Sequence, residues 1–158
     1  SRPDGNGILA TNPECLDIRV SGESAERALR LMDTLIKALH AAGFGVTVSE
    51  GATVISIDDS KIRISLQEEA RRRRIRAIEH DLEGYYQFGH RLYSDRAYPM
   101  GILSLVIDDK GFPYGVLARK AWRDTGQKKL EECLSGFISG VMKAAAIMKS
   151  LESRREDE

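Results

Sequence analysis

The feature that most constrains the fold is a run of apolar residues near the end of the chain. Its members follow one another in steps of four and three residues: Leu130, Leu134, Phe137, Val141, Ala144, Met148 and Leu151. Such steps place every member on one side of an α-helix. The sequence therefore predicts a long amphipathic helix whose apolar stripe must be covered by another part of the molecule. A charged tail over 152–158 is expected to follow it.

A second helix with a matching stripe is predicted over 21–43. Ser21 is expected to be its N-cap, and Gly43 the C′ residue that ends it. Its apolar positions also have helical spacing: Ala25, Ala28, Met32, Leu35, Leu39 and Ala42, widened by Leu29 and Ile36. The two stripes can cover each other and one face of a sheet.

Between the two helices the pattern changes to alternation, which predicts β-strands. The predicted strands are 15–20, 44–49, 53–57, 61–67, 100–108 and 114–120. In 61–67, Ile62, Ile64 and Leu66 alternate with polar residues, as is typical of an antiparallel sheet with one covered face. The predicted fold class is α+β: two layers, with a mostly antiparallel sheet of about five to six strands and two long helices packed on one face.

One domain is expected, because 158 residues bury a sizeable core without disulfides or metals. We expect a disordered lead-in over 1–13, a single domain over 14–151, and a basic and aromatic insertion within it at 68–99. Ile75, Ile78, Leu82 and Tyr85 have helical spacing, which predicts a short helix inside the insertion. A start without Met is typical of a piece of a longer protein.

Composition excludes some classes of protein. The formal net charge is zero, so the chain as a whole has no electrostatic bias towards nucleic acid or anionic lipid. The two cysteines, Cys15 and Cys133, are predicted to be buried free thiols, which indicates a reducing cytoplasm. The N-terminal segment lacks the apolar core of a signal peptide, and no run approaches the roughly 18 apolar residues of a membrane span. No membrane association is expected.

The segment 71–86 carries the candidate nucleic-acid contacts. It combines a basic run with tyrosines: Arg71, Arg72, Arg73, Arg74, Arg76, Tyr85 and Tyr86. Arginines can contact phosphates while aromatic rings stack on bases, as in proteins that bind single strands. The alternative is a solvated helix face whose charge is balanced by nearby acidic residues such as Glu68, Glu69 and Glu79.

No catalytic residue, metal site or cofactor is expected. Asp58, Asp59 and Lys61 invite comparison with nucleases that hold Mg²⁺ through a carboxylate and an adjacent lysine. Their position in a tight turn explains the same residues without any chemistry. The three histidines have no metal-ligand spacing, and no glycine-rich phosphate loop follows a strand.

Trp122 and a stripe of small residues are candidate packing or interface positions. Trp122 precedes the final helix and is expected to close the end of the core, with Asp124 or Thr125 capping the helix; a ligand platform or an interface anchor is the alternative. Gly136, Gly140 and Ala144 leave a groove on that helix. Glycine inside a helix costs about 1 kcal/mol relative to alanine, so we expect a close neighbour there, within the domain or from a second copy.

A family resemblance spans most of 15–155. The segments that carry it are 27–39, Tyr98-Pro99-Met100-Gly101-Ile102-Leu103, Trp122-Arg123-Asp124 and Leu130-Glu131-Glu132-Cys133-Leu134. They resemble the C-terminal regions of uncharacterised bacterial proteins, some of which have a DNA-binding helix-turn-helix segment upstream. The resemblance implies association with DNA in a larger bacterial protein and implies no catalytic residues.

The function expected from these features is that of a non-enzymatic binding or oligomerisation domain, possible partners being nucleic acid or a second copy of the chain. One alternative is a small-ligand sensor with an apolar pocket between the sheet and the C-terminal helix. A metal-dependent nuclease is the minor alternative.

Overall fold

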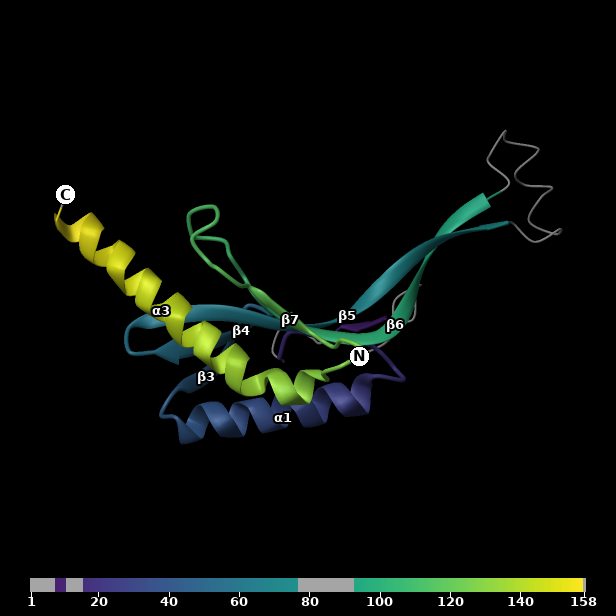
Figure 1. Ribbon diagram of the computed structural model, residues 1–158, viewed down its shortest axis with the longest axis horizontal. Coiled ribbons are helices and arrows are strands. Elements are labelled where there is room, and N and C mark those ends of the chain that lie inside the picture. The colour runs from purple at the N-terminus through teal and green to yellow at the C-terminus, as the bar shows by residue number, and fades with distance from the viewer. Residues whose placement is uncertain (1–7, 11–15, 77–92, 158) are drawn as a thin grey trace.

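The computed structural model describes residues 8–10, 16–76 and 93–157, with side chains described for 16–71 and 98–157 (Figure 1). Within these described residues, ten elements follow one another: β1 (Ile8–Ala10), β2 (Ile18–Ser21), α1 (Ala25–Ala41), β3 (Gly45–Ser49), β4 (Ala52–Ile57), β5 (Ser60–Arg76), β6 (Tyr93–Ile107), β7 (Ala121–Arg123), the 3₁₀ helix η1 (Leu130–Cys133) and α3 (Leu134–Asp157). β1 forms where a disordered lead-in was predicted.

The strands form one seven-stranded sheet in which β5 is central. β3, β4 and β5 form an antiparallel meander, β6 continues it on the other edge of β5, and β7 pairs with β6. β2 runs parallel to β5 and carries β1 at its outer edge. The α+β class with a mostly antiparallel sheet is confirmed. The sheet has seven strands rather than five to six because β1 and β7, of three residues each, also pair.

Local chemistry explains the boundaries of α1. Gly43 has a φ of +87° and ends the helix, as predicted. Ser21 is not the N-cap: it ends β2, and Ser24 occupies the N-cap position without a side-chain capping hydrogen bond. The N–H and hydroxyl of Ser21 bond instead to Glu68, so a tertiary partner has replaced the expected local one. Gly51 (φ +78°) makes the tight turn between β3 and β4.

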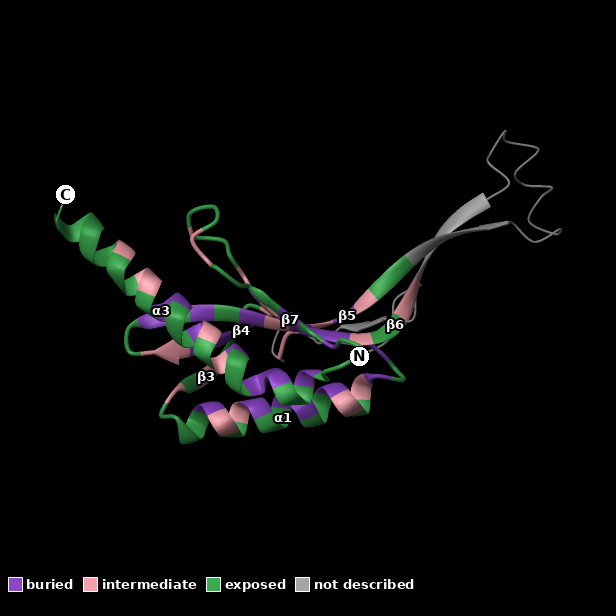
Figure 2. Ribbon diagram, viewed as in Figure 1, coloured by how far each residue is buried: buried purple, intermediate pink, exposed green. Residues whose placement is uncertain are grey.

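One face of the sheet supplies the core (Figure 2). Ile62, Ile64 and Leu66 of β5 are buried, while the alternating Lys61 and Arg63 are exposed. They form one cluster with residues of β6, of α1 and of the final helix, whose predicted stripe is buried from Leu130 through Ala144.

On α1 the predicted stripe needs two corrections. Leu29 is 59% exposed, and Ala42 lies outside the helix and is exposed. Leu31 is buried instead, which shifts the apolar stripe around the helix.

β5 and β6 are longer than predicted and continue beyond the core as a two-stranded ribbon (Figure 1). We call residues 70–76 and 93–99 the arm. Its pairing runs from Ala70 opposite Pro99 to Arg76 opposite Tyr93, after an irregular register between Glu68 and Ala70. The helix predicted in the insertion is therefore wrong at Ile75, which lies in β5; Ile78, Leu82 and Tyr85 fall outside the described residues.

The segment predicted as a strand at 114–120 is not one. Residues 108–120 form a loop without strand pairing, and only Ala121–Arg123 pairs with β6, as β7. Gly111 and Gly115 both have positive φ and Pro113 lies between them, which favours turns over an extended strand.

The C-terminal helix extends further than predicted. α3 continues to Asp157, so most of the predicted charged tail is helical. An 18-residue window within Leu130–Asp157 has a mean hydropathy of 1.2, so by length and composition alone this stretch could cross a membrane, although no membrane span was expected. The same stretch contributes Phe137 and Val141, both fully buried, to the domain core, and core helices of folded domains pass the same test.

Candidate nucleic-acid interface

The arm brings the arginine run into a two-stranded ribbon. Arg71, Arg72, Arg73 and Arg74 lie at consecutive register positions of β5, and Arg76 follows after Ile75; all are paired with β6. Of these five residues, Arg71 is the one whose side chain the structure describes, and it is exposed. The run therefore follows an extended ribbon and is not the solvated helix face of the alternative interpretation. Tyr85 and Tyr86 fall outside the described residues.

A buried carboxylate holds the base of the arm. Glu68 is 9% exposed, and its Oε1 accepts hydrogen bonds from the N–H and hydroxyl of Ser21, at 2.8 and 2.7 Å. Its Oε2 accepts the N–H of Gly101 at 2.6 Å. Burial alone would raise the pKa of Glu68, but these hydrogen bonds lower it. Glu68 thus joins β2 to the bulged part of β6, next to the point where the arm leaves the sheet.

Asp124 organises a second polar cluster in the body of the domain. Only 3% exposed, it receives two hydrogen bonds from Arg27, at 2.6 and 2.7 Å. It also accepts the N–H groups of Leu103 in β6 and Leu130 at the start of η1. Arg27 bonds Glu131 as well. Burial would raise the pKa of Asp124, but the hydrogen bonds from Arg27 and from the two amides lower it to about 2.

The cluster around Asp124 is structural in character, since every acceptor position of the carboxylate faces a donor of the fold. One part of this cluster was predicted from the sequence. Asp124 was one of two candidates for capping the final helix, and its carboxylate accepts the first N–H of η1. Arg27 lies 97 residues away in the chain and gave no signal.

Trp122 fills the small-residue groove of α3. The indole is 4% exposed, and its ring centroid lies 5.2 Å from that of Phe137 in an edge-to-face arrangement. A Cβ on Gly140 would lie 2.3 Å from Cη2 of the indole, so only glycine allows this approach, whereas a Cβ on Gly136 would meet Nε1 at 3.7 Å. The groove at Gly136 and Gly140 is therefore occupied within the chain, and Ala144 is fully buried.

The remaining sequence candidates do not come together. Asp58 and Asp59 lie exposed in the turn between β4 and β5, and Asp58 has a φ of +52°, which fits the turn interpretation. Among residues 8–10, 16–76 and 93–157, no three His, Cys, Asp or Glu side chains are grouped so as to hold a metal ion. His40 is exposed in the last turn of α1, and Cys133 is a buried free thiol.

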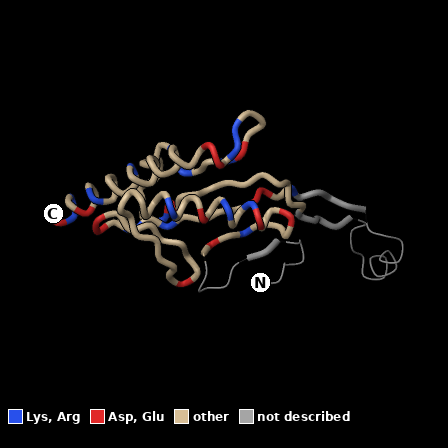
Figure 3. The backbone as a smooth tube through the Cα atoms, turned by 90° about the horizontal axis from the view of Figure 1, so that it is seen from below, with Lys and Arg blue, Asp and Glu red and all other residues tan. Residues whose placement is uncertain are grey.

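Outside the arm, the described charges of both signs are interspersed along the chain, as Figure 3 shows. This mixture accords with the zero net charge and makes the arginine run of β5 the most one-sided charged stretch of the sequence. Comparison with protein-family models, with curated proteins and with solved structures found no match.

Proposed function

We propose that the chain is a non-enzymatic DNA-binding module whose arm contacts duplex DNA, within a larger bacterial DNA-associated protein. The observation that carries this proposal is the continuation of β5 and β6 into a two-stranded ribbon bearing the arginine run. The major groove of B-DNA is about 12 Å wide and admits a two-stranded β-ribbon. This geometry favours a duplex over the single strand that the sequence pattern suggested.

Local charge supports the proposal despite the zero net charge. The arm contains six arginines and a single acidic residue, Asp95. Arginine binds phosphate oxygens with two parallel hydrogen bonds and also reads guanine edges. A ribbon that carries this many arginines in its sequence can thus contact the groove and the flanking phosphates together.

The test compares the wild-type chain with a variant in which Arg71, Arg72, Arg73, Arg74 and Arg76 are replaced by Gln. Binding of a labelled 24-base-pair duplex is followed by fluorescence anisotropy between about 50 and 200 mM salt. Each lost phosphate contact reduces the magnitude of the slope of log K against log [salt] by about 0.9, so the loss of three to five contacts should reduce it by about 2.7 to 4.5 units.

A matched control removes five positive charges elsewhere. Arg30, Lys37, Lys128, Lys149 and Arg154 are all exposed, and their replacement by Gln changes the net charge by the same amount. The affinity and the salt slope of the control should be much closer to those of the wild type than the values of the arm variant are. Equal loss in both variants would reduce the binding to a non-specific effect of net charge, and tighter binding of a single strand of the same length would contradict the duplex proposal.

A small-ligand sensor is the second candidate, supported by a cavity of about 320 Å³ beside Trp122. It lies between the 108–120 loop and α3, is lined mainly by apolar residues such as Leu117 and Ile147, and carries Arg119 and Lys143 with no acidic residue. This lining suits a small apolar anion. The test follows Trp122 fluorescence during titration with decanoate or anilinonaphthalene sulfonate. We expect quenching in the wild type and its loss in Lys143→Gln. An unchanged spectrum at a millimolar concentration of either probe would reject the sensor.

Self-association is also part of the proposal. β3 is an edge strand of five residues without a charge, whereas edge strands are commonly protected by Lys, Pro or bulges. Sedimentation velocity over a range of concentrations tests for a dimer, and Val48→Lys should abolish it.

We further propose that α1 and α3 cover the same face of the sheet and that the protein works in the cytoplasm, where the buried free thiol of Cys133 stays reduced.

A further inference from the structure

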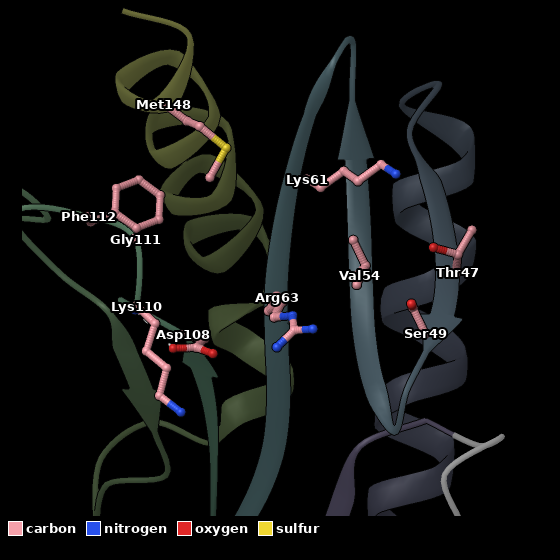
Figure 4. Close-up of a pocket in the computed structure, with 10 residues that line it drawn as sticks. All are labelled: Thr47, Ser49, Val54, Lys61, Arg63, Asp108, Lys110, Gly111, Phe112 and Met148. Carbon is pink, nitrogen blue, oxygen red and sulfur yellow. Dashed lines mark hydrogen bonds between the residues drawn. The ribbon is translucent and has the colours of Figure 1, made fainter. Parts of the chain in front are cut away.

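A shallow trough lies on the face of the sheet turned away from the core, which we call the open face (Figure 4). Its volume is about 480 Å³. Thr47 and Ser49 of β3, Val54 of β4 and Lys61 and Arg63 of β5 line the sheet part of it. Thr47, Val54 and Arg63 are cross-strand neighbours in the register, so they share this face.

Two cations extend over this surface. Figure 4 shows the side chain of Lys61 reaching from β5 across β4, and the shorter reach of Arg63 from β5 towards β4 and Val54. Val54 is only 6% exposed although it faces away from the core. Alkyl stems of lysine and arginine cover apolar surface while their charged groups stay in water, which accounts for this burial.

The polar groups of the trough have unused hydrogen-bonding capacity. Within the part of the chain that the structure describes, the side chains of Lys61 and Arg63 make no ion pair, and the hydroxyls of Thr47 and Ser49 make no side-chain hydrogen bond. Lys110 adds a third cation to the lining, and Asp108 is the single carboxylate. Oδ1 of Asp108 already accepts the N–H of Lys110 at 2.9 Å. Two cations beside two hydroxyls are suited to bind phosphate oxygens.

We propose that this trough binds the phosphate backbone of the same duplex that the arm contacts, as a second site on the body of the domain. The inference rests on the proposed function, because its ligand is the arm's ligand. Lys61, Arg63 and Arg71 are all odd-numbered positions of β5, so strand alternation assigns them to one face. Between Arg63 and Arg71, Glu69 is neutralised by an ion pair with Arg123 at 2.8 Å.

Distance along β5 sets the length of DNA required. Arg63 and Arg71 are eight residues apart, which corresponds to about 26 Å of strand at roughly 3.3 Å per residue. The phosphates of one DNA strand are about 3.4 Å apart along the helix axis, so the two sites are separated by roughly eight base pairs. A 24-base-pair duplex can reach both sites, whereas an 8-base-pair duplex can occupy fully only one.

The experiment measures anisotropy of both duplexes with the wild type, the double variant Lys61→Gln/Arg63→Gln, and the arm variant. On the 24-base-pair duplex the double variant should lose about two units of salt slope and at least tenfold in affinity at 100 mM salt. On the 8-base-pair duplex it should bind within about threefold of the wild type, because the arm alone holds that DNA. The control Arg30→Gln/Lys37→Gln removes the same charge from exposed positions of α1 and should leave both values near those of the wild type.

The outcomes separate the two proposals. If the double variant binds the long duplex with the slope and affinity of the wild type while the arm variant fails, the second site is wrong and the proposed function stands. If the double variant loses the two units and the arm variant loses none, the trough binds DNA and the arm proposal is wrong. Equal losses in the double variant and its control overturn the site. Urea midpoints of all variants show that each one is folded.

Discussion

β5 and β6 belong to two regions of very different character, the body of the domain and the arm. In the body, Ile64 pairs with Ile107 and Leu66 with Leu105, and all four side chains are at most 2% exposed. In the arm the same two strands pair with each other, but the described residues Ala70 and Arg71 at its base are exposed. The backbone hydrogen-bond ladder continues across the boundary, whereas the burial of β5 ends near Glu68 and gives way to exposed Ala70 and Arg71.

The difference shows that backbone pairing of two strands can continue in a long hairpin where burial of their side chains ends. A two-stranded ribbon alone is marginally stable in water, so the body must anchor the arm. Buried carboxylates supply part of this anchoring: Glu68 joins β2 to β6, and Asp124 joins α1, β6 and η1. We therefore expect substitutions in the body to act on stability and substitutions in the arm to act on binding.

The largest effect on stability is expected for Asp124→Ala. The substitution leaves Arg27 and the amides of Leu103 and Leu130 without their acceptor. Removing one partner of a buried ion pair costs about 3–5 kcal/mol of unfolding free energy, and the lower end applies because Arg27 is 31% exposed. Urea denaturation measures the change. Asp33→Ala, from the exposed pair with Lys37, should cost at most about 0.5 kcal/mol, and similar values for the two variants would contradict the special role of Asp124.

Acid should weaken the body through the same carboxylate. The pKa of Asp124 is about 2 in the folded protein, below its unfolded value of about 3.9. Its stabilisation is therefore complete above about pH 4 and is lost as the pH falls through about 2, a change of about 2 kcal/mol. The pKa of Glu68 is also lowered, so it acts in the same direction. Unfolding free energies between pH 6 and pH 2 test this, and Asp124→Asn should show a smaller loss than the wild type.

A pair of glycine substitutions on α3 should have opposite signs. Gly140→Ala forces the indole of Trp122 to move, because the new Cβ would lie 2.3 Å from it, and overpacking of this kind costs about 1–3 kcal/mol. Gly136→Ala makes an ordinary contact at 3.7 Å and gains up to about 1 kcal/mol of helix propensity. Thermal unfolding compares them. Stabilisation by Gly140→Ala would show that Trp122 does not need this glycine.

The smallest effect on stability is expected in the arm. Replacing its five β5 arginines by Gln should change the unfolding free energy by no more than about 0.5 kcal/mol, because Ala70 and Arg71 at the base of the arm are exposed and surface substitutions contribute little. Leu66→Ala on the same strand is the contrast: Leu66 is fully buried, and its truncation should cost about 2–5 kcal/mol. A large destabilisation by the arginine substitutions would mean that the arm has packing of its own.

Periodicity predicted the parts of the fold that bury a face. The steps of four and three that begin at Leu130 identified the stripe of the final helix, and the alternation of Ile62, Ile64 and Leu66 identified the covered face of β5. Both patterns are produced directly by burial on one side, so they can be read without knowing the partner. Gly43 ended α1 as predicted because a C′ glycine is a local requirement of the backbone.

Features that depend on distant partners gave little signal. Arg71–Arg74 and Arg76 have good helix propensity and no alternation, so the strand they form is decided by pairing with β6. Gly136 and Gly140 were recognised as a groove, but the residue that fills it, Trp122, could not be assigned from spacing. Glu68 was read as one of several acids balancing the arginines, although its buried hydrogen bonds join β2 to β6.

The bulge between Glu68 and Ala70 gives the arm a mechanical property. β5 and β6 run without interruption from the sheet into the arm, so movement of the arm requires bending of these two strands. Opposite Glu68–Ala70, β6 contains extra residues, among them Gly101 with a φ of +71°, and the N–H of Gly101 is held by Glu68. We expect this carboxylate to set the angle between the arm and the sheet. If the arm binds a duplex as proposed, Glu68→Gln should change the bend of that duplex more than the affinity for it.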